Sequence, residues 1–386
     1  MFVLALIVLT AMLGGVCYYL AHRAQKALSY LLPKLPLWVC IVVFAFLILL
    51  LLLGFVRSFL PISSGIKGVL GAISFYWMGI FLYLLLFVLL ADLVLWIVSL
   101  AKLIPADRVA LSRFVAGSAV LVLTASVSCY GFYHAQQIQT VSYDVTLAEH
   151  KTTDGMNIVM VSDLHLGALT SEERLEGIVE KINAQEPDLV CIVGDLFDND
   201  YSAIKDPERA IALLGGINAK YGVYACLGNH DSGETFAQME EFMRRANICN
   251  LKDAYVTVDD RLVLVGRVDA SPIGGYGNGE VKRNGDLSQI LLGANPDLPV
   301  VVMDHNPAHV EEYGSEVDLI LCGHTHKGQV FPGSLITGAM YTVDYGYYQK
   351  DAQSPHVIVS SGVGFWGPPM RVGSDCEVVQ IRLQNS

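Results

Sequence analysis

The sequence predicts an N-terminal transmembrane α-helical region followed by a layered α/β domain. Three observations lead to this prediction. Four long apolar stretches lie within the first 135 residues, and the remaining chain alternates short β-branched runs with amphipathic segments. Clusters of Asp, Asn and His follow several of those runs, where the loops of a layered α/β fold converge. The composition agrees, because 53% hydrophobic and 16% charged residues are too apolar for an ordinary soluble protein of 386 residues.

The apolar stretches are long enough to be membrane spans, since a helix needs about 20 apolar residues to cross a bilayer. They cover residues 2–20, 37–56, 69–100 and 114–133, and we expect four transmembrane helices. No charged segment precedes the first and three more follow it, so a retained anchor is favoured over a signal peptide. The third is either one tilted helix or two tight passes. Its Asp92 is expected to snorkel or to pair between helices rather than to catalyse.

The basic residues between these spans predict an orientation. Loops on the cytoplasmic side are rich in Lys and Arg. The loops after the first and third spans carry six such residues, whereas the loop after the second carries only Arg57 and Lys67. With four spans, the C-terminal domain of this integral cell-membrane protein is therefore expected to be extracytoplasmic, and an odd number of spans would reverse that. The eight cysteines lack close spacing, which favours a reducing side and opposes this orientation.

The charges divide unevenly along the chain and restrict the partners. Residues 1–135 contain eight basic residues and only two acidic ones, Asp92 and Asp107. The remainder carries 17 basic and 35 acidic residues, a net charge of −18. Such an acidic domain repels phosphate backbones, so nucleic acid is not an expected partner. The apolar N-terminal region is expected to lie in the lipid bilayer. The sequence indicates no protein partner.

Residues 137–386 form the predicted α/β domain. Thr170 and Glu173 have the spacing of a capping box, which predicts the start of a helix with an apolar face. A second helix is expected over residues 236–246, and a hairpin is expected to join residues 255–258 to 262–265. Six further runs have the length and composition of buried strands, namely residues 156–162, 188–193, 223–227, 298–303, 317–321 and 356–359.

Five short polar motifs follow the predicted strands. Their carboxylates, amide oxygen and imidazoles suit Mn, Fe or Zn ions better than a thiolate site would. Glycines precede three of the motifs and are expected to allow tight turns there. Any one motif is weak evidence, but five in this order, each at a strand end, indicate a site. They are Asp163-Leu164-His165, Gly194-Asp195-Leu196-Phe197-Asp198, Gly228-Asn229-His230-Asp231, Asp304-His305-Asn306-Pro307 and Gly323-His324-Thr325-His326.

The order of these motifs resembles that of the calcineurin-like metallophosphoesterase superfamily, over roughly residues 155–385. The glycine-rich segment 361–371 further resembles the membrane-associated branch related to bacterial YkuE and YaeI-type phosphodiesterases. The resemblance implies a four-layer αββα sandwich, in which two packed β-sheets are flanked by helices. It also implies two divalent metal ions, one held by Asp163, His165 and His326, the other by Asn229, His305 and His324.

The resemblance assigns three further roles. Asp195 would bridge both ions, His230 would approach the leaving-group oxygen, and Asp198 would orient the His230 imidazole. The physical chemistry agrees, because two ions about 3.5–4 Å apart stabilise both oxygens of a displacement at phosphorus and activate a water. His230 is outside the implied ligand set and so keeps a titratable nitrogen for acid catalysis. No Gly-x-Ser-x-Gly or phosphate-binding P-loop motif competes as a catalytic centre.

The expected function is metal-dependent hydrolysis of a phosphoester or pyrophosphate bond, on a membrane-linked or envelope substrate. Two alternatives stay open: a UDP-2,3-diacylglucosamine-type pyrophosphatase of lipid A-like biosynthesis, and a catalytically silent metal-binding membrane scaffold. Asn199 and Asp231 stand where protein Ser/Thr phosphatases carry Arg and Glu, which disfavours that class. Arg371 is interpreted either as a phosphate ligand or as a surface ion pair, and Phe365 with Trp366 either as a cleft wall or as core.

Overall fold

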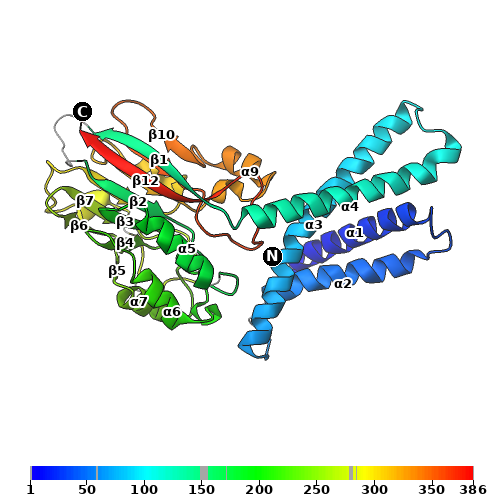
Figure 1. Cartoon of the computed structure of the whole chain (residues 1–386), viewed down its shortest axis with the longest axis horizontal. Coiled ribbons are helices and arrows are strands. Elements are labelled where there is room, and N and C mark those ends of the chain that lie inside the picture. The colour runs from blue at the N-terminus through cyan, green and yellow to red at the C-terminus, as the bar shows by residue number, and fades with distance from the viewer. Residues whose placement is uncertain are drawn as a thin grey trace. The chain divides into compact units, whose positions relative to one another are not determined.

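The computed structural model describes residues 2–57, 60–147, 155–170, 172–277, 281–283 and 285–385. Figure 1 shows the helices and strands of the chain. The chain divides into a helical unit and an α/β unit. The helical unit comprises Met1–Phe132 with Gly367–Pro369, and the α/β unit comprises Tyr133–Trp366 with Met370–Ser386.

The helical unit contains four long helices. They are α1 (Phe2–Leu28), α2 (Leu37–Val56), α3 (Ser64–Leu100) and α4 (Val109–His134), with a 3-10 turn at Ala106–Arg108 before the last. In the part of the chain that the structure describes, three helical segments are long and apolar enough to cross a membrane: Leu37–Val56, Gly65–Leu100 and Ala106–His134. The first side chains of α1 lie outside the described part, so a fourth crossing stays a prediction.

The third apolar stretch is one continuous helix of 37 residues rather than two passes. Its acidic residue is paired with α1, because the Asp92 carboxylate lies 2.6 Å from Arg23 Nε and accepts a hydrogen bond from the Tyr19 hydroxyl at 2.6 Å. A carboxylate among apolar helices is costly unless such partners neutralise it. The pairing therefore fits the structural role expected for Asp92.

Two six-stranded sheets form the α/β unit. The first has the order β1-β12-β2-β3-β4-β5, and β2 to β5 run parallel. The second has the order β10-β11-β9-β8-β7-β6, in which β7, β8, β9 and β11 are parallel and the two edge strands antiparallel. Their bounds are β1 (Ile138–Leu147), β2 (Asn157–Val161), β3 (Leu189–Val193), β4 (Val223–Cys226), β5 (Ile248–Asn250), β6 (Ala254–Val258), β7 (Leu262–Gly266), β8 (Val300–Met303), β9 (Leu319–Cys322), β10 (Gly346–Tyr348), β11 (His356–Val359) and β12 (Cys376–Asn385).

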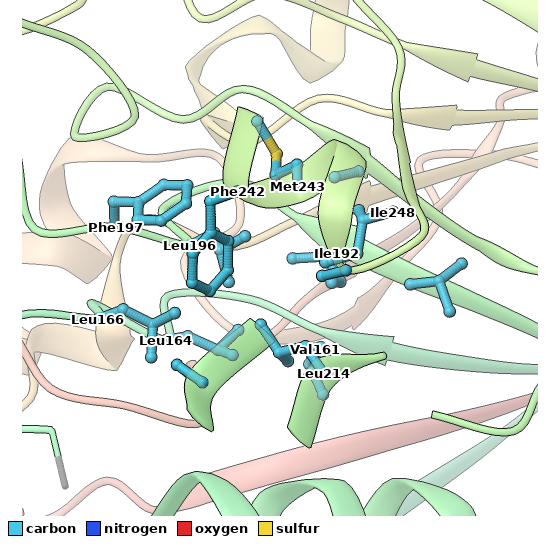
Figure 2. Packing of buried hydrophobic residues seen from close by; sticks show 14 of the residues in the cluster. Val161, Leu164, Leu166, Ile192, Leu196, Phe197, Leu214, Phe242, Met243 and Ile248 are labelled. Carbon is cyan, nitrogen blue, oxygen red and sulfur yellow. The ribbon is translucent and has the colours of Figure 1, made fainter. Parts of the chain in front are cut away.

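The sheets pack face to face, because one apolar cluster contains Ile158 and Met160 of β2 together with Leu264 and Met303 of the other sheet. The alternate side chains of β2 point away from this cluster into a second one, as the two-residue period of a strand requires. That second cluster joins the outer face of the first sheet to the helices α5 (Glu172–Asn183), α6 (Pro207–Leu214) and α7 (Phe236–Arg245). Figure 2 shows part of it, with Phe242 near Phe197.

The outer face of the second sheet is also covered. Val263 and Val302 pack in a third cluster with Ile290 of α8 (Leu287–Ile290) and Val310 of the 3-10 helix Pro307–Glu312. The resulting order of layers is helix, sheet, sheet, helix. The predicted four-layer sandwich is therefore confirmed.

The predicted strands and the predicted helix over residues 236–246 agree with the structure to within two residues at their ends, but four strands, β1, β5, β10 and β12, were not predicted. The helices α1, α3 and α4 extend beyond the predicted spans by up to eight residues at one end. The Thr170 hydroxyl donates to the carbonyl of His165 at 2.8 Å. The residue directly before α5 lies outside the described residues, so the capping box stays a prediction. The expected apolar face of α5 is buried as predicted, through Leu175, Ile178, Val179 and Ile182.

Candidate metal centre

The predicted site residues follow the carboxyl ends of parallel strands from both sheets. Asp163 and His165 follow β2, Asp195 follows β3, and Asn229 with His230 follows β4. The second sheet contributes His305 after β8, and His324 with His326 after β9. Because parallel strands end at the same edge of a sheet, their loops converge. Residues separated by up to 163 positions in the sequence are thereby brought into contact.

One group of ligand atoms comes from Asp163, His165 and His326, all buried and all within 4.8 Å of one another. The Nε2 atoms of His165 and His326 lie 3.2 Å apart, and His326 Nε2 lies 3.3 Å from Asp163 Oδ1. Two nitrogens bound to one ion at about 2.1 Å, with an angle of about 90–110° between them, lie about 3.0–3.4 Å apart. The spacing of this group fits a single metal ion.

A second group comes from Asp195, His305 and His324. His305 Nε2 lies 3.2 Å from Asp195 Oδ2, and the Nδ1 atom of His324 lies 2.9 Å from the side-chain oxygen of Asn229. The same Asp195 oxygen is 3.8 Å from His165 Nε2 in the first group. Asp195 therefore lies between the two groups, which is where a bridging carboxylate must be.

The protonation of the imidazoles fits metal binding, which requires neutral rings. Burial lowers the pKa of His165 to about 3 and that of His324 to about 4. Burial, together with the charge of Arg371, also lowers the pKa of His326. All three rings are therefore neutral at pH 7, with a lone pair available for a cation.

His305 differs from the other imidazoles. Burial lowers its pKa, but the carboxylates of Asp195 and Asp163 outweigh burial and raise the pKa well above its ordinary value. Its Nδ1 atom bonds the carbonyl of Val193 at 2.9 Å, whereas Nε2 has no hydrogen bond from any described residue. The ring thus directs Nε2 at two carboxylates, and the raised pKa shows that this position attracts positive charge. A metal ion would replace that proton.

Five of the site residues have left-handed backbone angles, which are unusual for residues other than glycine. The φ values are 55° at Asp163, 48° at His165, 51° at Asp195, 71° at His324 and 49° at His326. Such conformations cost of order 1–3 kcal/mol each and persist only where the surrounding structure enforces them. The ligands themselves, rather than the glycines before them, therefore carry most of the backbone strain.

The glycines before the motifs have two different functions. Gly194 has a φ of +72° and so makes the expected turn. Gly228 and Gly323 have no such angle, but their missing side chains leave space for the carboxylates. A Cβ on Gly228 would lie 2.2 Å from Asp195 Oδ1, and one on Gly323 would lie 2.5 Å from Asp163 Oδ2. The expectation of tight turns therefore holds for Gly194 alone.

His230 and Asp198 lie beside the first group. His230 Nδ1 is 3.7 Å from Asp198 Oδ1, within ion-pair range but beyond hydrogen-bond distance. The same carboxylate oxygen lies 3.9 Å from His165 Nδ1. The His230 ring is 5.0 Å from the His165 ring and 6.1 Å from that of Trp366, between centroids. The ligand atoms of His165, Asp198 and His230 also lie within 4.8 Å of one another, so His230 belongs to a third candidate group, which shares His165 with the first.

Arg371 is fully buried, which excludes the surface ion pair considered from the sequence. Its guanidinium donates to the carbonyls of Gly364 at 2.6 Å and His326 at 3.0 Å. It therefore fixes the backbone that carries a candidate ligand. Phe365 is buried against the Arg174 guanidinium at 4.9 Å, whereas Trp366 is 48% exposed near His230, so only Trp366 can form a cleft wall.

Sequence reasoning missed the supporting role of two buried carboxylates. Asp231 accepts hydrogen bonds from the backbone N–H groups of Phe197 and Gly228, both at 2.9 Å, and so joins two motif loops. Asp304 accepts from Arg283 at 2.7 Å and from the Tyr313 hydroxyl at 2.6 Å. Each carboxylate is adjacent in sequence to a site histidine, and that adjacency was the available signal.

Comparison with known proteins gives matches over this region. Residues 156–328 match the family described as calcineurin-like phosphoesterase. A bovine (Bos taurus) transmembrane protein with metallophosphoesterase domain is 31% identical over 282 residues, covering 68% of this chain and 61% of the relative. A Campylobacter jejuni metallophosphoesterase is 34% identical over 233 residues, covering 59% of each chain. The metallophosphoesterase YkuE of Bacillus subtilis is 31% identical over 245 residues, covering 60% of this chain and 80% of the relative. The chain thus spans about six tenths of the length of the first two.

Proposed function

This chain belongs to the calcineurin-like phosphoesterase family, and from that premise we propose that it hydrolyses a phosphoester or pyrophosphate bond with two divalent metal ions. The position of Asp195 is the observation that carries the proposal. Its Oδ2 atom lies 3.2 Å from His305 in one ligand group and 3.8 Å from His165 in the other. A carboxylate shared between two groups of imidazoles is well placed to bridge two cations.

We assign the residues to the two proposed ions by proximity. Asp163, His165 and His326 would hold one ion, while Asn229, His305 and His324 would hold the other, with Asp195 shared. Mn, Fe or Zn ions suit this mixture of oxygen and imidazole ligands. When bound, the ions would neutralise the charge of a substrate phosphate and lower the pKa of a water, so that hydroxide is available at neutral pH.

His230 would supply the proton that the leaving group needs. Imidazole titrates near neutral pH and can therefore donate a proton to a departing alkoxide. Asp198, 3.7 Å from His230 Nδ1, would hold the imidazolium form by charge and keep the opposite nitrogen directed into the site. Trp366, exposed and 6.1 Å from the His230 ring, would form one wall of the cleft that receives the substrate.

The substrate proposed is a membrane-linked or envelope phosphoester. Within the described part of the chain, three helices suited to crossing a membrane precede the site, and three residues separate the end of α4 at His134 from the start of β1. A relative with 31% identity is named a transmembrane protein with a metallophosphoesterase domain. Anchoring raises the rate of encounter with molecules confined to the same bilayer. An extracytoplasmic site, as proposed from the basic loops, would favour envelope lipids over cytoplasmic sugar nucleotides.

Turnover of bis(p-nitrophenyl) phosphate by the purified, Mn²⁺-loaded full chain tests the chemistry. The His230→Ala variant should lose at least about a hundredfold in kcat on a phosphodiester with an alkyl leaving group, the usual contribution of a general acid, and less on bis(p-nitrophenyl) phosphate, because p-nitrophenolate leaves without a proton. His309→Ala is the matched control, because His309 contacts Glu312 outside the site. If the unaltered chain binds two metal ions yet hydrolyses neither substrate, the protein is a metal-binding scaffold and the hydrolysis proposal fails.

A further inference from the structure

The helix α9 (Gly333–Met340) presents an apolar surface to solvent. It contains no charged side chain and no buried residue. Leu335, Ile336 and Met340 are 65%, 62% and 69% exposed, and Phe331 just before the helix is 46% exposed. A short helix normally buries such residues, and a contiguous exposed apolar patch marks an interaction site. We call Phe331, Leu335, Ile336, Met340 and Trp366 the α9 surface.

The α9 surface borders the metal centre. The helix follows the 3-10 turn that contains His326, and Tyr341 at its end has its ring 6.3 Å from that of His324. Trp366 is joined to the same segment through Gln329, whose amide donates to the Trp366 carbonyl at 2.9 Å and accepts from its N–H at 2.8 Å. A molecule that contacts the α9 surface is therefore adjacent to the site.

The first residues of the α/β unit lie beside the segment that leads to Trp366. Ala135, directly after α4, accepts a hydrogen bond from Arg174 at 2.8 Å, and Arg174 donates to Val363 and stacks over Phe365. Phe365 precedes Trp366 of the α9 surface. The three residues between α4 and β1 can span only about 10 Å. Figure 1 shows α9 and the start of β1 at the same end of the α/β unit.

We propose that the α9 surface inserts into the boundary of the lipid bilayer, so that the metal centre faces the headgroup layer. The membrane is the occupant that the observations favour. The helix has no charge to desolvate, and aromatic residues flank it as they do at membrane interfaces. The three-residue connection between α4 and β1 also keeps this end of the α/β unit near the bilayer. The consequence, access to lipid-borne phosphoesters, rests on the proposed function, whereas the insertion itself does not.

The experiment uses the full chain reconstituted into phosphatidylcholine–phosphatidylglycerol vesicles. Leu335→Cys is made in a Cys129→Ser, Cys249→Ser background, because Cys129 and Cys249 are exposed thiols. The new cysteine is labelled with the environment-sensitive fluorophore nitrobenzoxadiazole. We expect blue-shifted emission and a loss of intensity when lipids carry spin labels on their acyl chains.

Leu292→Cys is the matched control, since Leu292 is 84% exposed in the same unit. Its neighbour Leu291 lines a cavity with Thr146 and Leu147, at the opposite end of the ten-residue strand β1. That end is about 30 Å from the start of the strand. A label there should keep its red emission and should not respond to the spin-labelled lipids.

Two results would overturn the proposal. One is emission at Leu335→Cys that matches the control, which would leave the helix in water. The other is blue-shifted emission without quenching, which would place the helix against protein. Ile336→Cys, 62% exposed on the same helix, repeats the measurement if the first variant does not fold. Lipid quenching in a sample without bis(p-nitrophenyl) phosphate turnover would support the membrane surface and count against the hydrolysis, so the two proposals fail separately.

Discussion

Four features position the side chain of Asp195. Its Oδ1 atom accepts the backbone N–H of His230 at 2.8 Å, while Oδ2 lies 3.2 Å from His305 Nε2. Its backbone is left-handed, and Gly228 leaves the space that the carboxylate occupies. At the scale of single residues, the site thus depends on positions that hold ligands still as much as on the ligands. Changes at such supporting positions typically cost 10- to 100-fold in metal affinity.

Gly228→Ala should weaken metal binding. The added Cβ would lie 2.2 Å from Asp195 Oδ1 and 2.4 Å from the Asp195 backbone nitrogen, so the carboxylate must move. We expect a loss of about 10- to 100-fold in Mn²⁺ affinity, measured by titration calorimetry. Gly177→Ala is the control, because a Cβ at Gly177 on α5 meets no atom within 4 Å. Equal affinities in the two variants would contradict the assigned role of Asp195.

Metal affinity should rise with pH and do so most steeply below pH 6. Burial raises the pKa of Asp163 to about 6, so in the metal-free protein this carboxyl is protonated below that pH. A cation must displace that proton in addition to the one on His305, whose pKa is also raised, and each displaced proton costs about tenfold in affinity for each pH unit below its pKa. His165 and His324, with pKa values of about 3 and 4, stay neutral in this range and do not compete. Competition titrations between pH 5 and 8 measure the effect, and an affinity for Mn²⁺ that does not change with pH would refute it.

At the scale of elements, the site is assembled from several loops. Each of these loops follows a different strand. The β3 and β4 loops are joined by Asp231, and the loop before α9 is joined to the loop of Trp366 by Gln329. The strands beneath are short and buried on both faces. Their stability comes from the apolar clusters, and the helices α5, α6 and α7 cover the first sheet. The loops can therefore carry strained ligands because the layers below them are well packed.

Asp231→Asn should lower the free energy of unfolding. One carboxylate now accepts from both Phe197 and Gly228, but an amide has a single oxygen, so a buried N–H would lose its partner. The expected cost is about 1–3 kcal/mol, seen as a lower melting temperature of the purified chain in detergent. Asp259→Asn in the β6–β7 hairpin is the control, since the Asp259 side chain is 53% exposed. Similar melting temperatures for the Asp231 and Asp259 variants would show that the loops do not depend on this bridge.

At the scale of the whole molecule, the number of membrane crossings decides which compartment the site faces. Among the described residues, three helical segments have the length and hydropathy to cross, and α1 would make a fourth. The Arg23–Asp92 pair holds α1 against α3, as expected of neighbouring helices in one bundle. An even number, with the basic loops inside, would place the α/β unit outside the cytoplasm.

A reporter fused after Ser386 tests this orientation. A β-lactamase fusion there should confer ampicillin resistance, because the enzyme acts outside the cytoplasm. A second fusion after Asp107, in the basic loop before α4, should not, and it controls for expression. Resistance only from the second fusion would place the site in the cytoplasm. That outcome would overturn the outward orientation and would favour a sugar-nucleotide substrate.

The sequence by itself determined the apolar helices, the layered α/β class and the identities of the polar residues that meet in the site. These features are local, since hydropathy, strand composition and motif chemistry are each readable within a few residues. Only the tertiary structure decided the insertion of β12 between β1 and β2, the burial of Arg371 behind His326, and the exposure of α9. Those features depend on contacts between distant segments. Arg371, for example, is 45 positions from His326, and no local pattern shows which carbonyls a buried guanidinium will reach.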